Sequence, residues 1–68
     1  MKYMRIELFR LDGHGEREGN CGTVDYYVKK IEIEEDHYKI TSIKDMSGEE
    51  ITYNVPVRKY EIQINAFI

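Results

Sequence analysis

The sequence predicts an all-β domain, built as a small five-stranded antiparallel barrel or rolled sheet. Three observations indicate this class. The chain has 68 residues, the length of one domain covering residues 1–68. Apolar and polar residues alternate with a period of two in five short segments, and no segment has a helical period. All five glycines and the single proline fall between these segments, where turns are needed.

The first predicted strand covers Tyr3–Leu11. Met4 and Ile6 alternate with charged residues, but the apolar phase changes at Phe9. Because one extra residue in a strand exchanges its two faces, we expect a β-bulge near Leu8–Phe9.

The second predicted strand covers Val24–Glu34. Tyr26 is in phase with the apolar residues of the first half, so we expect it to face inward. Tyr27 is then expected to face outward beside the charged Asp25. The apolar phase changes again in the second half, which predicts another bulge near Lys29–Lys30.

A tight hairpin is predicted between strands at His37–Ile43 and Glu50–Val55. Asp45 and Gly48 stand at the first and last positions of a type I turn, and Gly48 suits the left-handed position of a bulged hairpin. That turn pairs Ile43 with Ile51. The apolar phase instead places Ile40 opposite Tyr53, one residue out of register. Near the tip we expect the register set by the turn.

The chain is expected to leave the sheet briefly at Pro56, which has no N–H for a ladder hydrogen bond. A single 3₁₀ turn over 57–59 then leads into a fifth strand at Tyr60–Ile68. A long first loop, a tight hairpin, a short turn and a closing strand together resemble the SH3-like barrel. The resemblance is architectural. The aromatic peptide groove of true SH3 domains is not found, so no proline-peptide binding is implied.

Composition argues against several classes of protein. Ten basic and thirteen acidic residues give a net charge of −3, whereas a nucleic-acid-binding protein is expected to carry a basic patch or stripe. Cys21 stands alone, so no disulfide framework exists, and a reducing cytoplasmic location is expected. The N-terminal segment lacks the apolar run of a secretory signal, and no segment has the 18 or so apolar residues of a membrane span.

No metal, cofactor or enzymatic activity is predicted. His14, Cys21 and His37 lack the close pairs of a structural zinc site. The loop around Cys21 holds Glu16 and Glu18, which disfavour the thiolate that a nucleophile needs. The glycine-rich loop Asp12–Thr23 leads into a strand rather than a helix, so it does not match a phosphate-binding loop. A loop this long in so small a domain is functional or mobile.

The predicted function is that of a small protein-interaction module. An exposed tyrosine flanked by charges is a common interface composition, and acidic runs suit a basic partner. The partner is expected to bind the exposed tyrosine, an acidic flank and the loop Asp12–Thr23. The predicted partner-binding residues are Tyr27, Asp25, Glu32, Glu34, Glu35, Asp36, His14 and Arg17. A small, acidic chain also fits a phage- or mobile-element-encoded regulator or inhibitor of a host macromolecule.

Two further expectations remain open. The apolar C-terminus "INAFI" indicates a packed chain end, either within the domain or as a strand against another copy, so a homo-oligomer is expected as one outcome. The alternative function is an oligomeric protein that binds a nucleotide or metabolite between subunits. Its candidate anion-binding residues are Arg5, Arg10, Arg58 and Lys59.

Overall fold

The computed structural model describes residues 3–44 and 47–68, and these contain five β-strands. The strands are β1 (Met4–Arg10), β2 (Thr23–Ile33), β3 (His37–Ile43), β4 (Glu50–Pro56) and β5 (Tyr60–Phe67). Each strand agrees with a predicted one to within one residue at either end. The prediction of an all-β fold from period-two alternation is therefore confirmed.

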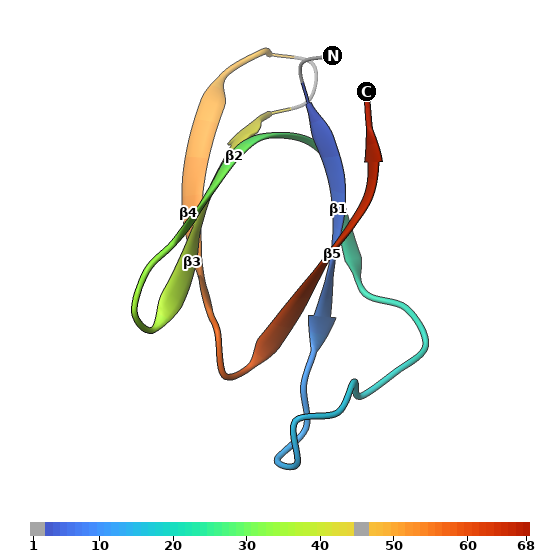
Figure 1. Ribbon diagram of the computed structural model, residues 1–68. Coiled ribbons are helices and arrows are strands. Elements are labelled where there is room, and N and C mark those ends of the chain that lie inside the picture. The colour runs from blue at the N-terminus through green and yellow to red at the C-terminus, as the bar shows by residue number, and fades with distance from the viewer. Residues whose placement is uncertain (1–2, 45–46) are drawn as a thin grey trace.

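All five strands form one antiparallel sheet in the order β4-β3-β2-β1-β5. The sheet is rolled, because the first half of β2 pairs with β1 and its second half pairs with β3. Figure 1 shows the β3–β4 half and the β1–β5 half facing each other, with the long loop after β1 extending below them.

The roll does not close into a barrel. Within residues 3–44 and 47–68 no ladder joins β4 to β5. The turn between these strands is instead tied to the β2–β3 hairpin, where Val57 N donates to Asp36 O at 3.1 Å. This bond holds the end of β4 beside β3 rather than beside β5. The predicted rolled sheet is thus observed, and the closed barrel is not.

The core lies between the two halves of the rolled sheet. Each of β1 to β4 contributes one buried aliphatic side chain, namely Ile6, Val28, Ile40 and Val55. Burial of one such side chain stabilises a fold by about 1.5–3 kcal/mol. Seven half-buried apolar residues surround them: Met4, Leu8, Ile31, Tyr38, Tyr53, Tyr60 and Ile62.

The bulge predicted near Leu8–Phe9 was wrong. The register of β1 on β5 runs without a break from Ile6 to Arg10, and it shifts earlier, between Arg5 and Ile6. Phe9 therefore lies on the outer face, yet it is only 4% exposed. The reason is Arg17, whose guanidinium carbon lies 3.6 Å from the centre of the Phe9 ring. Phe9 is buried by the loop rather than by the core.

The predicted bulge near Lys29–Lys30 is confirmed, since the register of β2 on β3 shifts between Val28 and Lys30. A second irregularity in β2 was not predicted. On the β1 side, Val28 pairs with Met4 but Asp25 pairs with Ile6, so two residues of β2 lie opposite one residue of β1. These two residues are Tyr26 and Tyr27.

The β3–β4 hairpin follows the apolar register over its whole length, so the register predicted from the turn was wrong. Ile40 pairs with Tyr53, and Ser42 rather than Ile43 pairs with Ile51. A one-residue slip of β4 on β3 would turn the buried Val55 to the outer face, and its burial decides the register. Gly48 does take the left-handed conformation, with φ of 72°. The predicted type I turn begins at Asp45, which lies outside the described residues.

Pairing was expected to end before Pro56, but β4 continues through it and pairs Pro56 with His37. Lys44 N donates to Glu49 O at the hairpin tip. Because alternate residues of an antiparallel strand bond to the same neighbour, the nitrogen of Pro56 faces the free edge of β4. Its missing N–H therefore removes no ladder bond. The predicted single turn over 57–59 is present, closed by Lys59 N donating to Pro56 O at 3.2 Å.

No helix in the described parts of the chain has the length and apolar character needed to cross a membrane.

Candidate functional site

A cleft of about 380 Å³ opens between the first half of β2 and the tip of the β3–β4 hairpin. Its walls are aromatic and aliphatic, and a carboxylate and a hydroxyl line it as well. The lining includes Tyr26, Tyr27, Asp25, Ser42, Ile51 and Tyr53. An apolar cleft with a few converging polar groups is the usual composition of a binding site.

Asp25 is the acidic residue that lines this cleft. It lies opposite Ile6, whose side chain is fully buried, so the carboxylate points to the inner side of the sheet. Tyr53 Oη donates to Asp25 Oδ2 at 2.6 Å. The Ser42 hydroxyl lies 2.8 Å from Asp25 Oδ1 and 3.1 Å from the carbonyl oxygen of Tyr27. Side chains of β3 and β4 therefore hold the carboxylate in one orientation.

Tyr53 remains a hydrogen-bond donor over the whole physiological pH range. Burial is the main factor that raises the pKa of its phenol above the ordinary value of 10.0, and the hydrogen bond to Asp25 and the charge of that carboxylate raise it further. Both oxygens of Asp25 thus receive hydroxyl donors, which orient the carboxylate without cancelling its negative charge.

No lysine or arginine in the described part of the chain forms an ion pair with Asp25. One basic residue, Lys44, also lines the cleft, and it is exposed. A carboxylate in a largely apolar cleft attracts cations strongly, because water screens it less than at an open surface.

Tyr26 and Tyr27 form the exposed aromatic wall. Their side chains are 54% and 39% exposed, and their ring centres lie 6.5 Å apart. Tyr27 also packs edge-on against Tyr3, with ring centres 5.8 Å apart. The expectation that Tyr26 packs inward was wrong, because at the irregularity in β2 both tyrosines are exposed and line the cleft. The same irregularity places Asp25 on the inner side of the sheet rather than beside Tyr27 on the outside.

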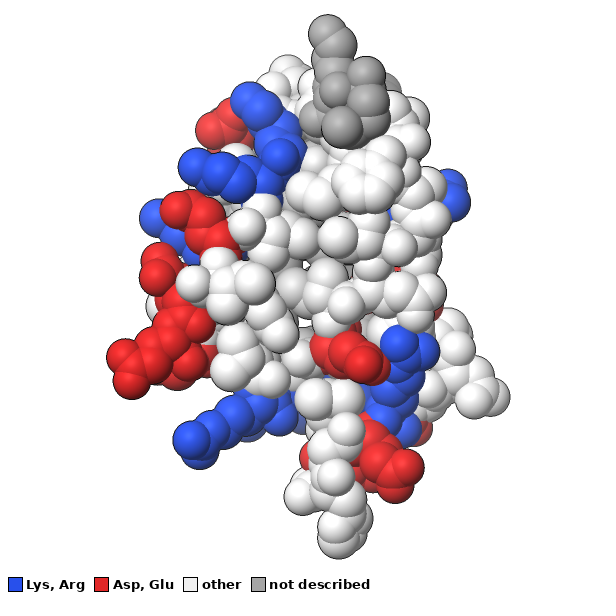
Figure 2. Space-filling view, in the orientation of Figure 1, with Lys and Arg blue, Asp and Glu red and all other residues white. Residues whose placement is uncertain are grey.

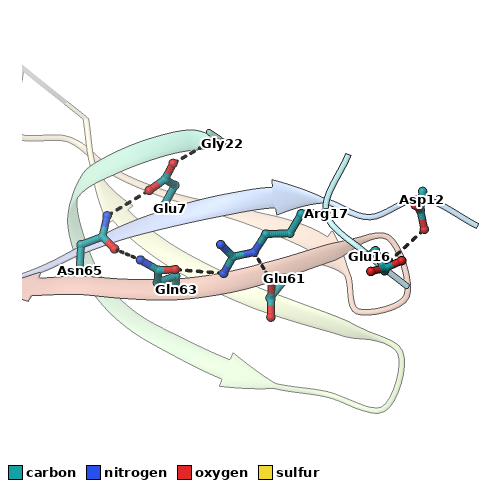
Figure 3. Close-up of polar contacts among 8 residues, drawn as sticks. All are labelled: Glu7, Asp12, Glu16, Arg17, Gly22, Glu61, Gln63 and Asn65. Atoms are coloured by element: carbon teal, nitrogen blue, oxygen red, sulfur yellow. Dashed lines mark hydrogen bonds and ion pairs between the residues drawn. The ribbon is translucent and has the colours of Figure 1, made fainter. Parts of the chain in front are cut away.

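The glycine-rich loop is fixed on the other face of the sheet (Figure 3). Arg17 donates from Nε to Glu61 Oε1 at 2.5 Å and from a terminal nitrogen to Gln63 Oε1 at 3.0 Å. The chain of hydrogen bonds continues through Asn65 to Glu7, which accepts the backbone N–H of Gly22 at 2.7 Å.

Glu7 therefore links β1, β5 and the end of the loop. The hydrogen bond from Gly22 is the largest factor that holds the pKa of Glu7 below its ordinary value of 4.5, followed by the bond from Asn65. At the other end of the loop, the Asp12 carboxylate accepts the N–H groups of His14 and Glu16. Gly15 completes that turn with φ of 82°.

The residues predicted as one interface lie in three places. Tyr27 and Asp25 border the cleft, whereas Arg17 lies over Phe9 on the outer face and His14 is exposed in the loop turn. The acidic residues Glu32, Glu34, Glu35 and Asp36 lie at the β2–β3 hairpin, the opposite end of β2 from the cleft.

Charges at the β2–β3 hairpin are partly paired. Lys30 Nζ lies 3.7 Å from Glu32, and His37 Nδ1 lies 2.7 Å from Asp36. The hydrogen bond from His37, and then its charge when protonated, lower the pKa of Asp36 below 3.8. Figure 2 shows acidic and basic side chains intermixed along the left flank and near the bottom of this view, with a broad uncharged area over the rest of it.

The candidate anion-binding residues are partly brought together. Arg10, Arg58 and Lys59 line a hollow of about 410 Å³ beside the loop. Two acidic residues, Asp12 and Glu18, line the same hollow, and Arg10 lies 3.7 Å from Glu18. Arg5 is at the other end of β1, opposite Ala66.

Cys21 is exposed. Within the described ranges 3–44 and 47–68, no three His, Cys, Asp or Glu side chains lie close enough together to share a metal ion.

Comparisons with protein-family models, with curated proteins and with solved structures found no match to this chain.

Most residues of the cleft escaped the analysis of the sequence, among them Ser42, Ile51 and Tyr53. Their contribution depends on strand register, because Ser42 and Tyr53 reach Asp25 only when β3 and β4 pair by the apolar phase. The sequence did contain a signal for this register, because the alternation of apolar residues placed Ile40 opposite Tyr53. The register predicted from the hairpin turn was preferred near the tip, so the signal was not used there.

Proposed function

We propose that this chain is a small non-enzymatic protein-interaction module whose cleft receives a basic side chain of its partner. Asp25 is the observation that carries the proposal. Its carboxylate faces a largely apolar cleft, has hydroxyl donors on both oxygens, and forms no ion pair with a described lysine or arginine. The partner is a protein that presents a lysine or arginine at its surface.

Two interactions favour such a guest. A hydrogen bond to a charged group contributes about 1.5–3 kcal/mol. A cation beside the ring of Tyr26 or Tyr27 adds about 0.5–1 kcal/mol at an exposed site and about 2 kcal/mol when water is excluded. Because Ser42 and Tyr53 already orient the carboxylate, Asp25 loses little freedom on binding.

The acidic balance of the chain supports a basic partner. The net charge is −3, and the β2–β3 hairpin carries several carboxylates outside the cleft. Charges of this kind raise the rate of encounter with a basic protein more than they raise the final affinity. A regulator or inhibitor that occupies a basic site on a host macromolecule, including a phage- or mobile-element-encoded one, fits this description.

The proposal is tested by titrating ¹⁵N-labelled protein with short peptides that carry one central arginine or lysine. A citrulline peptide is the neutral control of the same shape. We expect the basic peptides to shift the amide signals of Tyr26, Tyr27 and Ser42, and the citrulline peptide to leave them in place. Loss of one charge-assisted hydrogen bond predicts roughly tenfold to hundredfold weaker binding to Asp25→Asn.

Two matched variants complete the experiment. Glu34→Gln removes an exposed carboxylate away from the cleft and leaves the affinity unchanged. Lys44→Met removes a cation from the cleft and raises the affinity. If Asp25→Asn binds the arginine peptide as well as the unmodified protein does, or if citrulline binds as well as arginine, the cleft is not a site for cations.

We also infer that the rolled sheet belongs with SH3-like barrels in outline. Three features support this inference: the strand order, the participation of β2 in both halves of the sheet, and the short turn before β5. The inference concerns architecture alone.

A second candidate function is anion binding at the hollow beside the loop, because Arg10, Arg58 and Lys59 converge there. Titration with inorganic phosphate and with a nucleoside triphosphate tests it. Saturable shifts of the Arg58 and Lys59 amides that disappear in Arg58→Gln support an anion site. Shifts that persist in that variant contradict it.

A further inference from the structure

Strand β5 has one edge without a partner strand. It pairs with β1 from Tyr60 to Phe67, and within the described ranges no backbone hydrogen bond joins its other side to a strand. Natural edge strands are usually protected by proline, lysine or other charges. The opposite edge, β4, ends in Pro56, but β5 contains no proline, lysine or arginine. Its one charged residue, Glu61, is paired with Arg17.

The backbone groups that face the free edge can be assigned. Leu11 N donates to Lys59 O, so Lys59 bonds toward β1. The register is continuous from Tyr60 to Ile64, and alternate residues of an antiparallel strand bond to the same side. The N–H and C=O groups of Tyr60, Ile62 and Ile64 therefore face the free edge.

An apolar surface adjoins this edge. Ile64 is 47% exposed and Phe67 is 62% exposed. Across the gap between the two halves of the sheet, Ile33 is 77% exposed, and it lines a largely apolar hollow of about 380 Å³ together with Tyr38, Ile62 and Ile64. The free edge and this hollow together make one surface, which we call the seam.

The protein has a larger accessible surface than a compact monomer of the same mass. Its accessible area is 5130 Å², whereas a compact monomer of its mass exposes about 4,500 Å². Its radius of gyration is 12.2 Å, against about 11 Å for a compact chain of this length. The excess area, roughly 600 Å², approaches the 800 Å² or so that each partner contributes to a standard interface.

We propose that a second copy of this chain covers the seam, by antiparallel pairing of β5 with β5 about a two-fold axis through Gln63. In this register Ile62 lies opposite Ile64 of the partner subunit, and both residues direct their backbone groups to the shared edge. Glu61 lies opposite Asn65 of the partner subunit, so no like charges face each other. The strand is thus complementary to itself, as an isologous interface requires.

The proposal is tested on the full chain by light scattering and native mass spectrometry over micromolar to near-millimolar concentrations. We expect a dimer that dissociates on dilution. Amide exchange at Ile62 and Ile64 is expected to slow as concentration rises, since β1 does not use these two N–H groups. The exchange measurement needs no variant, so a folding defect cannot obscure it.

Ile64→Lys adds an inward-pointing charge at the free edge and is expected to weaken the dimer by about tenfold or more. Ile51→Lys is the matched control, because it makes the same change at a residue of similar exposure (40%) on the other edge strand. It leaves the dimer intact. A monomer at every concentration, or equal weakening by both variants, overturns the proposal. Neither result bears on the cleft at Asp25.

Discussion

Gly22 offers a direct test of how closely the loop is joined to the sheet. A Cβ atom at this position would lie 2.1 Å from Leu8 O and 2.7 Å from Leu8 C, whereas ordinary contacts begin near 3.4 Å. Both atoms belong to the backbone of β1, so they cannot move aside as a flexible side chain would. Gly22→Ala must separate the loop from β1 beside Thr23, whose pairing with Leu8 ends the β1–β2 ladder. It also disturbs the hydrogen bond from Gly22 N to Glu7.

Overpacking of this kind destabilises a protein by about 1–3 kcal/mol. The loss is large here, because a chain of this length is expected to have roughly 3–10 kcal/mol of stability. The assay is urea unfolding followed by far-UV circular dichroism, with the change in free energy taken from the midpoint at constant slope.

Gly13→Ala is the matched control within the same loop. A Cβ at Gly13 meets no atom within 4 Å, and the residue does not have positive φ. This variant is expected to range from neutral to about 1 kcal/mol more stable, because alanine restricts the unfolded chain. The reasoning is refuted if Gly22→Ala unfolds at the same urea concentration as the unmodified protein, or if Gly13→Ala is destabilised as much.

Three further predictions follow from the polar contacts. Arg17→Lys keeps the positive charge but loses the planar group over Phe9 and the second hydrogen-bond donor to Gln63. We therefore expect the free energy of unfolding to fall by about 0.5–2 kcal/mol and proteolysis within residues 12–22 to become faster. Unchanged proteolysis would show that Arg17 does not hold the loop. The lowered pKa of Glu7 means that its contribution to stability is complete above the ordinary value of 4.5 and is lost as the pH falls through the lower folded-state value. Glu7→Gln should therefore flatten the acid side of the stability profile between those two values, and an unaltered profile would contradict this. Tyr53→Phe removes a hydroxyl donor from Asp25 and should cost about 1.5–3 kcal/mol in urea unfolding, while Asp25→Asn combined with Tyr53→Phe should cost less than the sum of the two single changes.

Only part of the candidate site could be predicted from the sequence. Tyr27 and Asp25 were recognised as neighbours with functional potential, and both line the cleft. Their orientation could not be predicted, because it follows from a register shift between β1 and β2 that leaves no mark in the order of residues. Arg17 contacts Phe9 and Glu61 and so fastens the loop to the sheet, a role the sequence did not indicate, while its role in partner binding stays a prediction.

The order of residues by itself determined the class of fold, the five strands and the places where the chain turns. Those features depend on local chemistry, since side chains alternate along every extended segment and glycine permits the turn at Gly48. Tertiary structure decided the strand registers, the burial of Phe9 under Arg17, the open seam along β5 and the meeting of Ser42 and Tyr53 at Asp25. Each of these depends on contacts between residues distant in the chain, and the free energy of burying Val55 outweighed the local preference of the hairpin turn.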